Sequence, residues 1–134
     1  GIAVGLDEGL LVPVVKGADK MSLTEFVVAM KDLTERTFSK KLLPDEQAGS
    51  TFTISNLGMY GVDEFTAIIN QPNAAILSVA STQQRAVPID GEIVIRPIMK
   101  ISLTSDHRII DGLTAAKFMT DLKAAMEDPL TLFI

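Results

Sequence analysis

The side chain best suited to chemistry in this sequence is the imidazole of His107, the only histidine among the 134 residues. An imidazole can take up and return a proton near neutral pH, so it is suited to general-base catalysis. Charged and polar residues surround it in the stretch Ser105-Asp106-His107-Arg108-Ile109-Ile110-Asp111-Gly112. A lone histidine is also commonly a structural surface residue, and spacing alone does not separate the two interpretations.

Two rigid elements are predicted on either side of His107. Residues 93–104 are mostly β-branched or large and apolar, which is typical of a strand. Asp111 is placed to cap a helix over residues 111–126, whose apolar side chains recur every three or four residues and predict a face turned to the core. His107 would then lie on a short connection held by a rigid scaffold. Arg108 is expected to pair with Asp106.

Residues 49–61 form a second stretch of interest, Gly-Ser-Thr-Phe-Thr-Ile-Ser-Asn-Leu-Gly-Met-Tyr-Gly. Residues 51–55 alternate polar with apolar side chains and predict a strand, and residues 56–61 predict a glycine-hinged turn. By itself this pattern indicates only a strand whose Thr and Ser side chains face solvent.

The remaining elements follow from local signals. Residues 22–25 match a capping box and start an amphipathic helix that ends before Pro44. Gly9 predicts a tight connection between two apolar runs at the start of the chain. Residues 65–70, 74–80, 83–89 and 92–103 predict strands, and Asp90-Gly91 predicts a two-residue hairpin turn before the last of them.

Composition excludes several classes of function. A net charge of −5 argues against nucleic-acid binding, and no apolar run reaches the roughly 18 residues of a membrane span. The absence of cysteine excludes disulfides and a cysteine nucleophile, and with one histidine the sequence predicts no metal site. Hydrophobic residues make up 47% of the chain, which is high for a small monomer and indicates oligomerisation.

Two motifs carry a resemblance to a known family. Asp-His-Arg-Ile-Ile-Asp-Gly at 106–112 and Thr-Phe-Thr-Ile-Ser-Asn-Leu-Gly at 51–58 resemble segments of the dihydrolipoamide acyltransferases of 2-oxo acid dehydrogenase complexes, relatives of the chloramphenicol acetyltransferases. The resemblance implies an α/β (α+β) fold: a two-layer sandwich in which helices flank a mixed β-sheet, as in chloramphenicol acetyltransferase. Residues 1–134 would be the C-terminal portion of the catalytic domain, with its N-terminal part and the lipoyl and subunit-binding domains absent.

The resemblance also implies a reaction and its residues. An acyl group would move between the thiols of dihydrolipoamide and coenzyme A, with the lipoyl group on a separate domain and no metal. His107 would be the general base, Ser55 would donate to the oxyanion and Asp111 would fix the loop. Weaker candidates for binding substrate are Asn56, Gly58, Met59, Phe65 and Asn70. The segments 55–61 and 65–72 look most like members that transfer acetyl groups in pyruvate dehydrogenase.

The family resemblance extends to partners. It implies a homotrimer with the histidine from one chain and the serine from the next, assembling further into a core through apolar tails like residues 130–134. The decarboxylase and dihydrolipoamide dehydrogenase would be further partners, in bacterial cytoplasm or the mitochondrial matrix. Two alternatives stay open: an inactive structural core fragment, and a chloramphenicol-type enzyme that acetylates a hydroxyl group.

Overall fold

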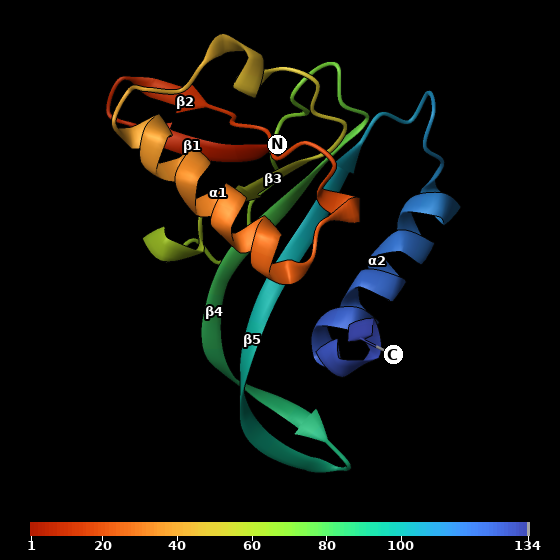
Figure 1. Cartoon of the computed structure of the whole chain (residues 1–134). Helices are drawn as coiled ribbons and strands as arrows, with labels where there is room; N and C mark the ends of the chain where they lie inside the picture. Colours follow the sequence, from red (N-terminus) through yellow and green to blue (C-terminus); the bar gives the residue numbers. More distant parts are fainter. Residues whose placement is uncertain (134) are drawn as a thin grey trace.

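A computed structural model describes residues 1–133 of the chain. Its strands form one sheet in the order β2-β1-β3-β4-β5, with two α-helices beside it (Figure 1). The sheet is mixed, because β1 and β3 both run parallel to a neighbour while β2 and β5 are antiparallel. The elements are β1 (Ile2–Leu6), β2 (Gly9–Leu11), α1 (Leu23–Phe38), β3 (Thr53–Asn56), β4 (Ala75–Ile89), β5 (Glu92–Ser105) and α2 (Gly112–Glu127).

Helix α1 begins at the predicted capping box. The Ser22 hydroxyl accepts the Glu25 backbone N–H, and the Glu25 carboxylate accepts the Ser22 backbone N–H. At the other end of the helix, the Arg36 guanidinium donates to Glu46, with 2.7 Å between Nη2 and Oε1. The Glu46 carbonyl in turn accepts the Val14 backbone N–H at 2.8 Å. This chain of bonds ties α1 to the segment that follows β2.

The longest pairing in the sheet joins β4 to β5. Asp90 and Gly91 both have positive φ, which the predicted two-residue turn requires. Residues 74–80 and 83–89, predicted as two strands, are instead one strand, β4. A register shift between Val79 and Thr82 absorbs the polar interruption that suggested a break. The far half of the hairpin projects from the rest of the molecule (Figure 1), and Ile93 is 80% exposed there.

Two further strand predictions need correction. β3 begins at Thr53 rather than at residue 51. Residues 65–70 form no strand, because this segment runs across β5, β4 and β3 and bonds to their hydroxyl side chains. A chain that crosses strands cannot add a ladder of backbone bonds to them. Local alternation of residue types does not reveal that direction.

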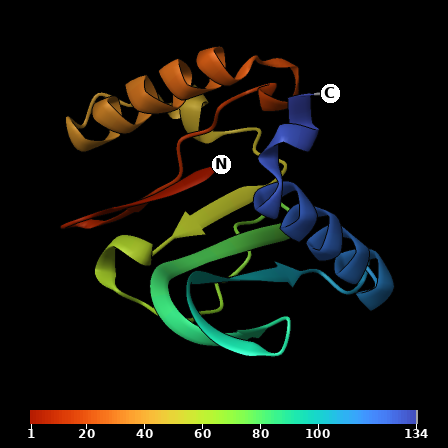
Figure 2. The same ribbon diagram turned by 90° about the horizontal axis from the view of Figure 1, so that it is seen from below.

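The apolar stripe of α2 was predicted to be core, and this is wrong for the single chain. The helix lies beside the open edge of β5, and none of its residues is buried (Figures 1 and 2). The Phe118 ring contacts that of Phe52, with 5.9 Å between centroids, yet Phe118 remains 42% exposed. The stripe therefore lacks most of the partners that would cover it.

The exposed area of the whole chain leads to the same conclusion. It is 9580 Å², whereas a compact monomer of 14.4 kDa exposes about 6,800 Å². An excess of this size is comparable to what a subunit buries in an obligate oligomer. The described chain therefore leaves a large surface open to further protein contacts.

We predict that the contact between Arg36 and Glu46 stabilises the fold in a pH-dependent way. Hydrogen bonds from Arg36 lower the pKa of Glu46 to about 2. Because the pKa is lower in the folded state, the stabilisation is present above the usual glutamate pKa and is lost as the pH falls toward 2. Glu46→Gln should lower the melting temperature at neutral pH by a few degrees, and the difference should vanish near pH 2.

Glu35→Gln serves as the control, since the Glu35 side chain makes only an exposed pair with Lys31 at 3.9 Å. Thermal unfolding of the three proteins from pH 7 to pH 2 provides the measurement. Equal melting temperatures for both variants at pH 7 would contradict the prediction.

Candidate functional site

The turn that carries His107 is anchored by backbone hydrogen bonds. The Asp106 N–H donates to the Ala74 carbonyl at 2.8 Å, so the turn is fastened to the start of β4. The Asp106 carbonyl accepts the N–H groups of Ile109 and Ile110 at 3.1 and 2.9 Å. His107 therefore lies on a short, bonded connection between β5 and α2, as the sequence predicted.

The predicted ion pair between Asp106 and Arg108 is confirmed. The Arg108 Nη2 lies 2.6 Å from Asp106 Oδ2, and the Arg108 backbone N–H donates to Oδ1 at 3.0 Å. These bonds lower the pKa of Asp106 to about 2. Asp106 is therefore a carboxylate throughout the neutral range, and the Arg108 guanidinium is paired with it.

Asp111 caps α2. Its Oδ1 accepts the Thr114 backbone N–H at 2.7 Å, and its Oδ2 accepts the Thr114 hydroxyl at 3.2 Å. The backbone bond is the main cause that lowers the Asp111 pKa, the hydroxyl bond adds to it, and the nearby His107 contributes a smaller electrostatic part. A carboxylate held in this way fixes the end of the turn and is poorly suited to carrying a proton.

The His107 imidazole itself is exposed and makes no hydrogen bond to any described residue. Its ring nitrogens are thus available to an external group. The backbone on both sides of it is held firmly, while the side chain is left free.

Ser55 lies on a sheet face that carries five hydroxyl side chains. The strand registers place Ser55 opposite Ser78, and Ser78 opposite Ser102. Ile76 lies two residues before Ser78 and so on the same face, and its cross-strand neighbours Thr53 and Thr104 add two more hydroxyls to that face. We call this the hydroxyl face, and its members are Thr53, Ser55, Ser78, Ser102 and Thr104.

Ser55 differs from most members of the hydroxyl face because its hydroxyl makes no bond to the described residues. Thr53, Ser78 and Ser102 all bond to the segment that crosses this face. Thr104 also lacks a partner among the described residues, but its oxygen is fully buried. The half-buried Ser55 hydroxyl is therefore the one that is both free and accessible.

A single chain keeps Ser55 and His107 apart. Two strand spacings separate β3 from β5, and β5 continues three residues beyond Ser102 before it ends. With about 4.8 Å between strands and about 3.3 Å per residue, the end of β5 lies roughly 14 Å from Ser55. No hydrogen bond links the two side chains within the described chain.

The weaker candidates have mixed positions. Asn56 Oδ1 accepts the Gly58 N–H at 2.8 Å, so the Asn56 side chain shapes the turn after β3. A Cβ at Gly58 would lie 2.9 Å from the Ala80 carbonyl oxygen, so glycine is needed for this turn to pack on β4. Met59 is 72% exposed. Asn70 donates to Thr53 at 3.4 Å on the hydroxyl face.

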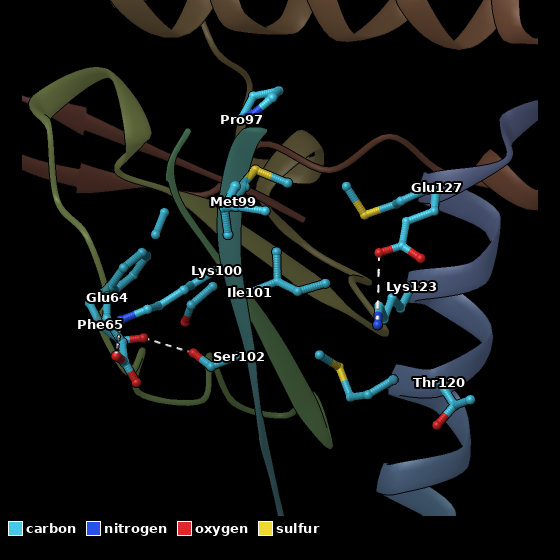
Figure 3. A pocket seen from close by; sticks show the side chains of 15 residues that line it. Glu64, Phe65, Pro97, Met99, Lys100, Ile101, Ser102, Thr120, Lys123 and Glu127 are labelled. Carbon is cyan, nitrogen blue, oxygen red and sulfur yellow. Dashed lines mark hydrogen bonds and ion pairs between the residues drawn. The ribbon is translucent and has the colours of Figure 1, made fainter. Parts of the chain in front are cut away.

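Phe65 lines a groove of about 910 Å³ that runs along β5 toward α2 (Figure 3). One side of the groove holds Phe65 and Glu64, and the other holds side chains of α2 such as Lys123. Ser78 and Ser102 also line it, although the sequence did not single them out. Each lies in a predicted strand, but only the strand register places them in a row with Ser55.

Two other kinds of feature are absent from the described residues. Residues 1–133 contain no group of three side chains that could hold a metal ion. Neither of the described α-helices is long and apolar enough to cross a membrane.

Comparison with known proteins gives consistent results. The profile of the family "2-oxoacid dehydrogenases acyltransferase (catalytic domain)" matches residues 1–134. The chain is 45% identical over 136 residues to the mitochondrial dihydrolipoyllysine-residue acetyltransferase component of the pyruvate dehydrogenase complex from Schizosaccharomyces pombe, covering 99% of this chain and 28% of that protein. It is also 45% identical over 134 residues to a succinyltransferase component of the 2-oxoglutarate dehydrogenase complex from Rickettsia typhi, covering 100% and 34%.

Solved structures agree with these relatives. A structure of Azotobacter vinelandii dihydrolipoamide acetyltransferase, studied for the roles of a serine, a histidine and an asparagine in its catalytic mechanism, superposes with a TM-score of 0.93 at 38% identity. The cubic core of the pyruvate dehydrogenase multienzyme complex gives the same values. Both comparisons cover 100% of this chain and 55% of the solved chain. They confirm the expected fold, which is that of chloramphenicol acetyltransferase, while the chain spans only about a third of its curated relatives.

We predict that Arg108 is the main cause of the low Asp106 pKa. Replacement by glutamine removes the guanidinium but keeps the backbone N–H, so Arg108→Gln should raise the Asp106 pKa from about 2 partway toward its usual value. Carboxyl-carbon NMR titration measures this directly. Arg96→Gln, which removes a guanidinium from β5 far from the turn, is the control, and an unchanged pKa in Arg108→Gln would refute the assignment.

Proposed function

Because the chain belongs to the family of 2-oxoacid dehydrogenase acyltransferases, we propose that it transfers an acetyl group between the thiols of dihydrolipoamide and coenzyme A. His107 is the general base, and Ser55 stabilises the oxyanion. The observation that carries the proposal is the pair of free side chains, an imidazole and a hydroxyl, on firmly held backbone. Their chemistry matches the two tasks of thioester exchange.

A relative supports the residue assignment. The serine, histidine and asparagine of the A. vinelandii acetyltransferase are separated along its chain by the same numbers of residues as Ser55, His107 and Asp111 here. An asparagine caps a helix as well as an aspartate does, but it cannot carry a proton. The difference at this position therefore favours a positioning role for Asp111.

The first step of the proposed reaction forms a carbon–sulfur bond. The neutral His107 imidazole takes the proton from the attacking thiol, and the resulting thiolate adds to the carbonyl carbon of the thioester. The carbonyl π electrons move to oxygen, which becomes negatively charged. The Ser55 hydroxyl donates a hydrogen bond to that oxygen, where the charge is greatest in the transition state.

The second step breaks the other carbon–sulfur bond. The oxyanion collapses to a carbonyl, and the departing sulfur leaves as a thiolate. This thiolate recovers the proton from the His107 imidazolium, so the base returns to its neutral form. The two thiols have similar chemistry, so the same base serves both directions and no acyl-enzyme forms.

The proposed site lies between two copies of the chain. Ser55 and His107 do not meet within one copy, and the large exposed area of the chain provides room for an interface. We propose that three copies form a ring with His107 of one facing Ser55 of the next, since heterologous contacts of this kind close into cyclic assemblies. Such trimers would build a larger core, with the apolar residues 130–134 as a contact between them.

The choice of acetyl over succinyl rests on the sequence of residues 55–61 and 65–72, because relatives of both kinds match equally well. A lipoyl group on a separate domain, the decarboxylase and dihydrolipoamide dehydrogenase complete the proposed system. Its compartment would be the bacterial cytoplasm or the mitochondrial matrix.

The first test measures acetyl transfer from acetyl-coenzyme A to dihydrolipoamide by the assembled chain. His107→Ala should lower kcat by about two to four orders of magnitude, as expected for loss of a general base. Asp111→Asn should retain most of the activity, since it keeps the helix cap. Activity that survives in His107→Ala would exclude this mechanism, and an inactive wild-type chain would favour a structural core fragment instead.

A second test locates the site between copies. His107→Ala and Ser55→Ala chains are each expected to be inactive alone. When the two are co-expressed and mix at random, about a quarter of the sites should pair an intact histidine with an intact serine. Recovery of up to about a quarter of wild-type kcat supports a shared site. If no activity returns in mixed trimers of proven composition, both residues act within one chain.

A further inference from the structure

The segment of residues 65–70 crosses the whole hydroxyl face. The Ser102 hydroxyl of β5 donates to the Phe65 carbonyl at 2.7 Å (Figure 3). The Ala67 N–H donates to the Ser78 hydroxyl of β4 at 3.1 Å, and the Asn70 side chain donates to the Thr53 hydroxyl of β3 at 3.4 Å. Residues of three successive strands thus hold a segment that has no helix or strand bonds of its own.

Ion pairs hold the chain just before this segment. Lys100 of β5 contacts Asp63 at 3.0 Å and Glu64 at 2.8 Å, and Arg85 of β4 contacts the other oxygen of Asp63. The Val62 carbonyl accepts the Ser81 backbone N–H at 2.8 Å. These side chains are partly exposed, so water weakens the ion pairs and each contributes little to stability.

The hydrogen bonds of the serine hydroxyls to residues 65–70 are less exposed than these ion pairs. Ser78 is 1% exposed and accepts the partly buried Ala67 N–H, and an N–H that loses its acceptor carries a desolvation cost to the extent that water cannot replace it. Ser78 is also the cross-strand neighbour of Ser55 on the same face, about 4.8 Å away from strand to strand. The segment bonded to Ser78 therefore lies beside the free Ser55 hydroxyl, while Phe65 at its other end lines the groove.

We propose that Ser78 and Ser102 are positioning residues, whose hydroxyls hold residues 65–70 against the hydroxyl face as one wall of the site at Ser55. The inference rests on the proposed function for its effect on turnover. Its structural part, that these two hydroxyls keep the segment in place, stands on the hydrogen bonds alone. The wall restricts where the thioester carbonyl can lie, and thereby directs its oxygen toward Ser55.

Amide hydrogen exchange followed by NMR tests the structural part. Ser78→Ala should make the Ala67 amide exchange roughly fivefold faster or more, because it removes the acceptor of that N–H, while amides of the β4–β5 ladder keep their wild-type rates. Ser81→Ala is the matched control: it removes a buried hydroxyl from the same strand, and its backbone bond to Val62 remains. Equal Ala67 exchange in Ser78→Ala and Ser81→Ala would overturn the proposal.

Kinetics tests the effect on the site. Ser102→Ala should lower kcat about tenfold, with a smaller change in KM, because a misplaced wall weakens contacts formed in the transition state. Ser102→Thr keeps a hydroxyl and should restore most of the lost kcat, whereas Ser81→Ala should leave kcat unchanged. Unchanged kcat in Ser102→Ala would overturn the functional part. If the wild-type chain is inactive, the proposed function fails, and the exchange rates alone decide whether the two hydroxyls hold the segment.

Discussion

The antiparallel pairing of β4 with β5 is the interaction on which the other features of this chain depend. It runs from the tight turn at Asp90-Gly91 to the pair Ala75 and Ser105, where the chain leaves the sheet for the His107 turn. The same register puts Ser78 opposite Ser102, and a parallel pairing on the other side puts Ser78 opposite Ser55. A slip of one residue would turn these hydroxyls to the opposite face. One register therefore sets both the position of the base and the composition of the hydroxyl face.

A face of small hydroxyl side chains has a consequence for the backbone that lies on it. Serine and threonine leave room for a close approach and offer both donors and acceptors. An irregular segment can therefore cross the strands and still satisfy its partly buried N–H and carbonyl groups, as Ala67 and Phe65 do. Apolar side chains at the same positions would leave those groups unpaired. Such a segment forms a fixed wall of backbone beside Ser55. The Ser55 hydroxyl makes no hydrogen bond to the described residues, so it is free to bond to a substrate.

Rigid backbone and free side chains occur together at the His107 turn as well. Asp106 and Asp111 accept hydrogen bonds at its two ends, and these bonds lower the pKa of both groups and favour their carboxylate forms. The imidazole between them is left unbonded, and the half-covered apolar stripe of α2 follows directly after it. The incompletely buried helix therefore lies directly beside the unbonded imidazole.

Signals that act over a few residues determined much of this protein from its sequence. The capping box at Ser22, the cap at Asp111, the turn at Asp90-Gly91 and the place of His107 after a strand all depend on neighbouring residues, and all were predicted correctly. Long-range geometry decided the rest. The continuity of β4 through its bulge, the path of residues 65–70 across the strands and the exposure of α2 depend on which distant segments meet. Alternation along a strand reports which side chains share a face but not which strand lies alongside, so only the tertiary structure could bring Ser78 and Ser102 into line with Ser55.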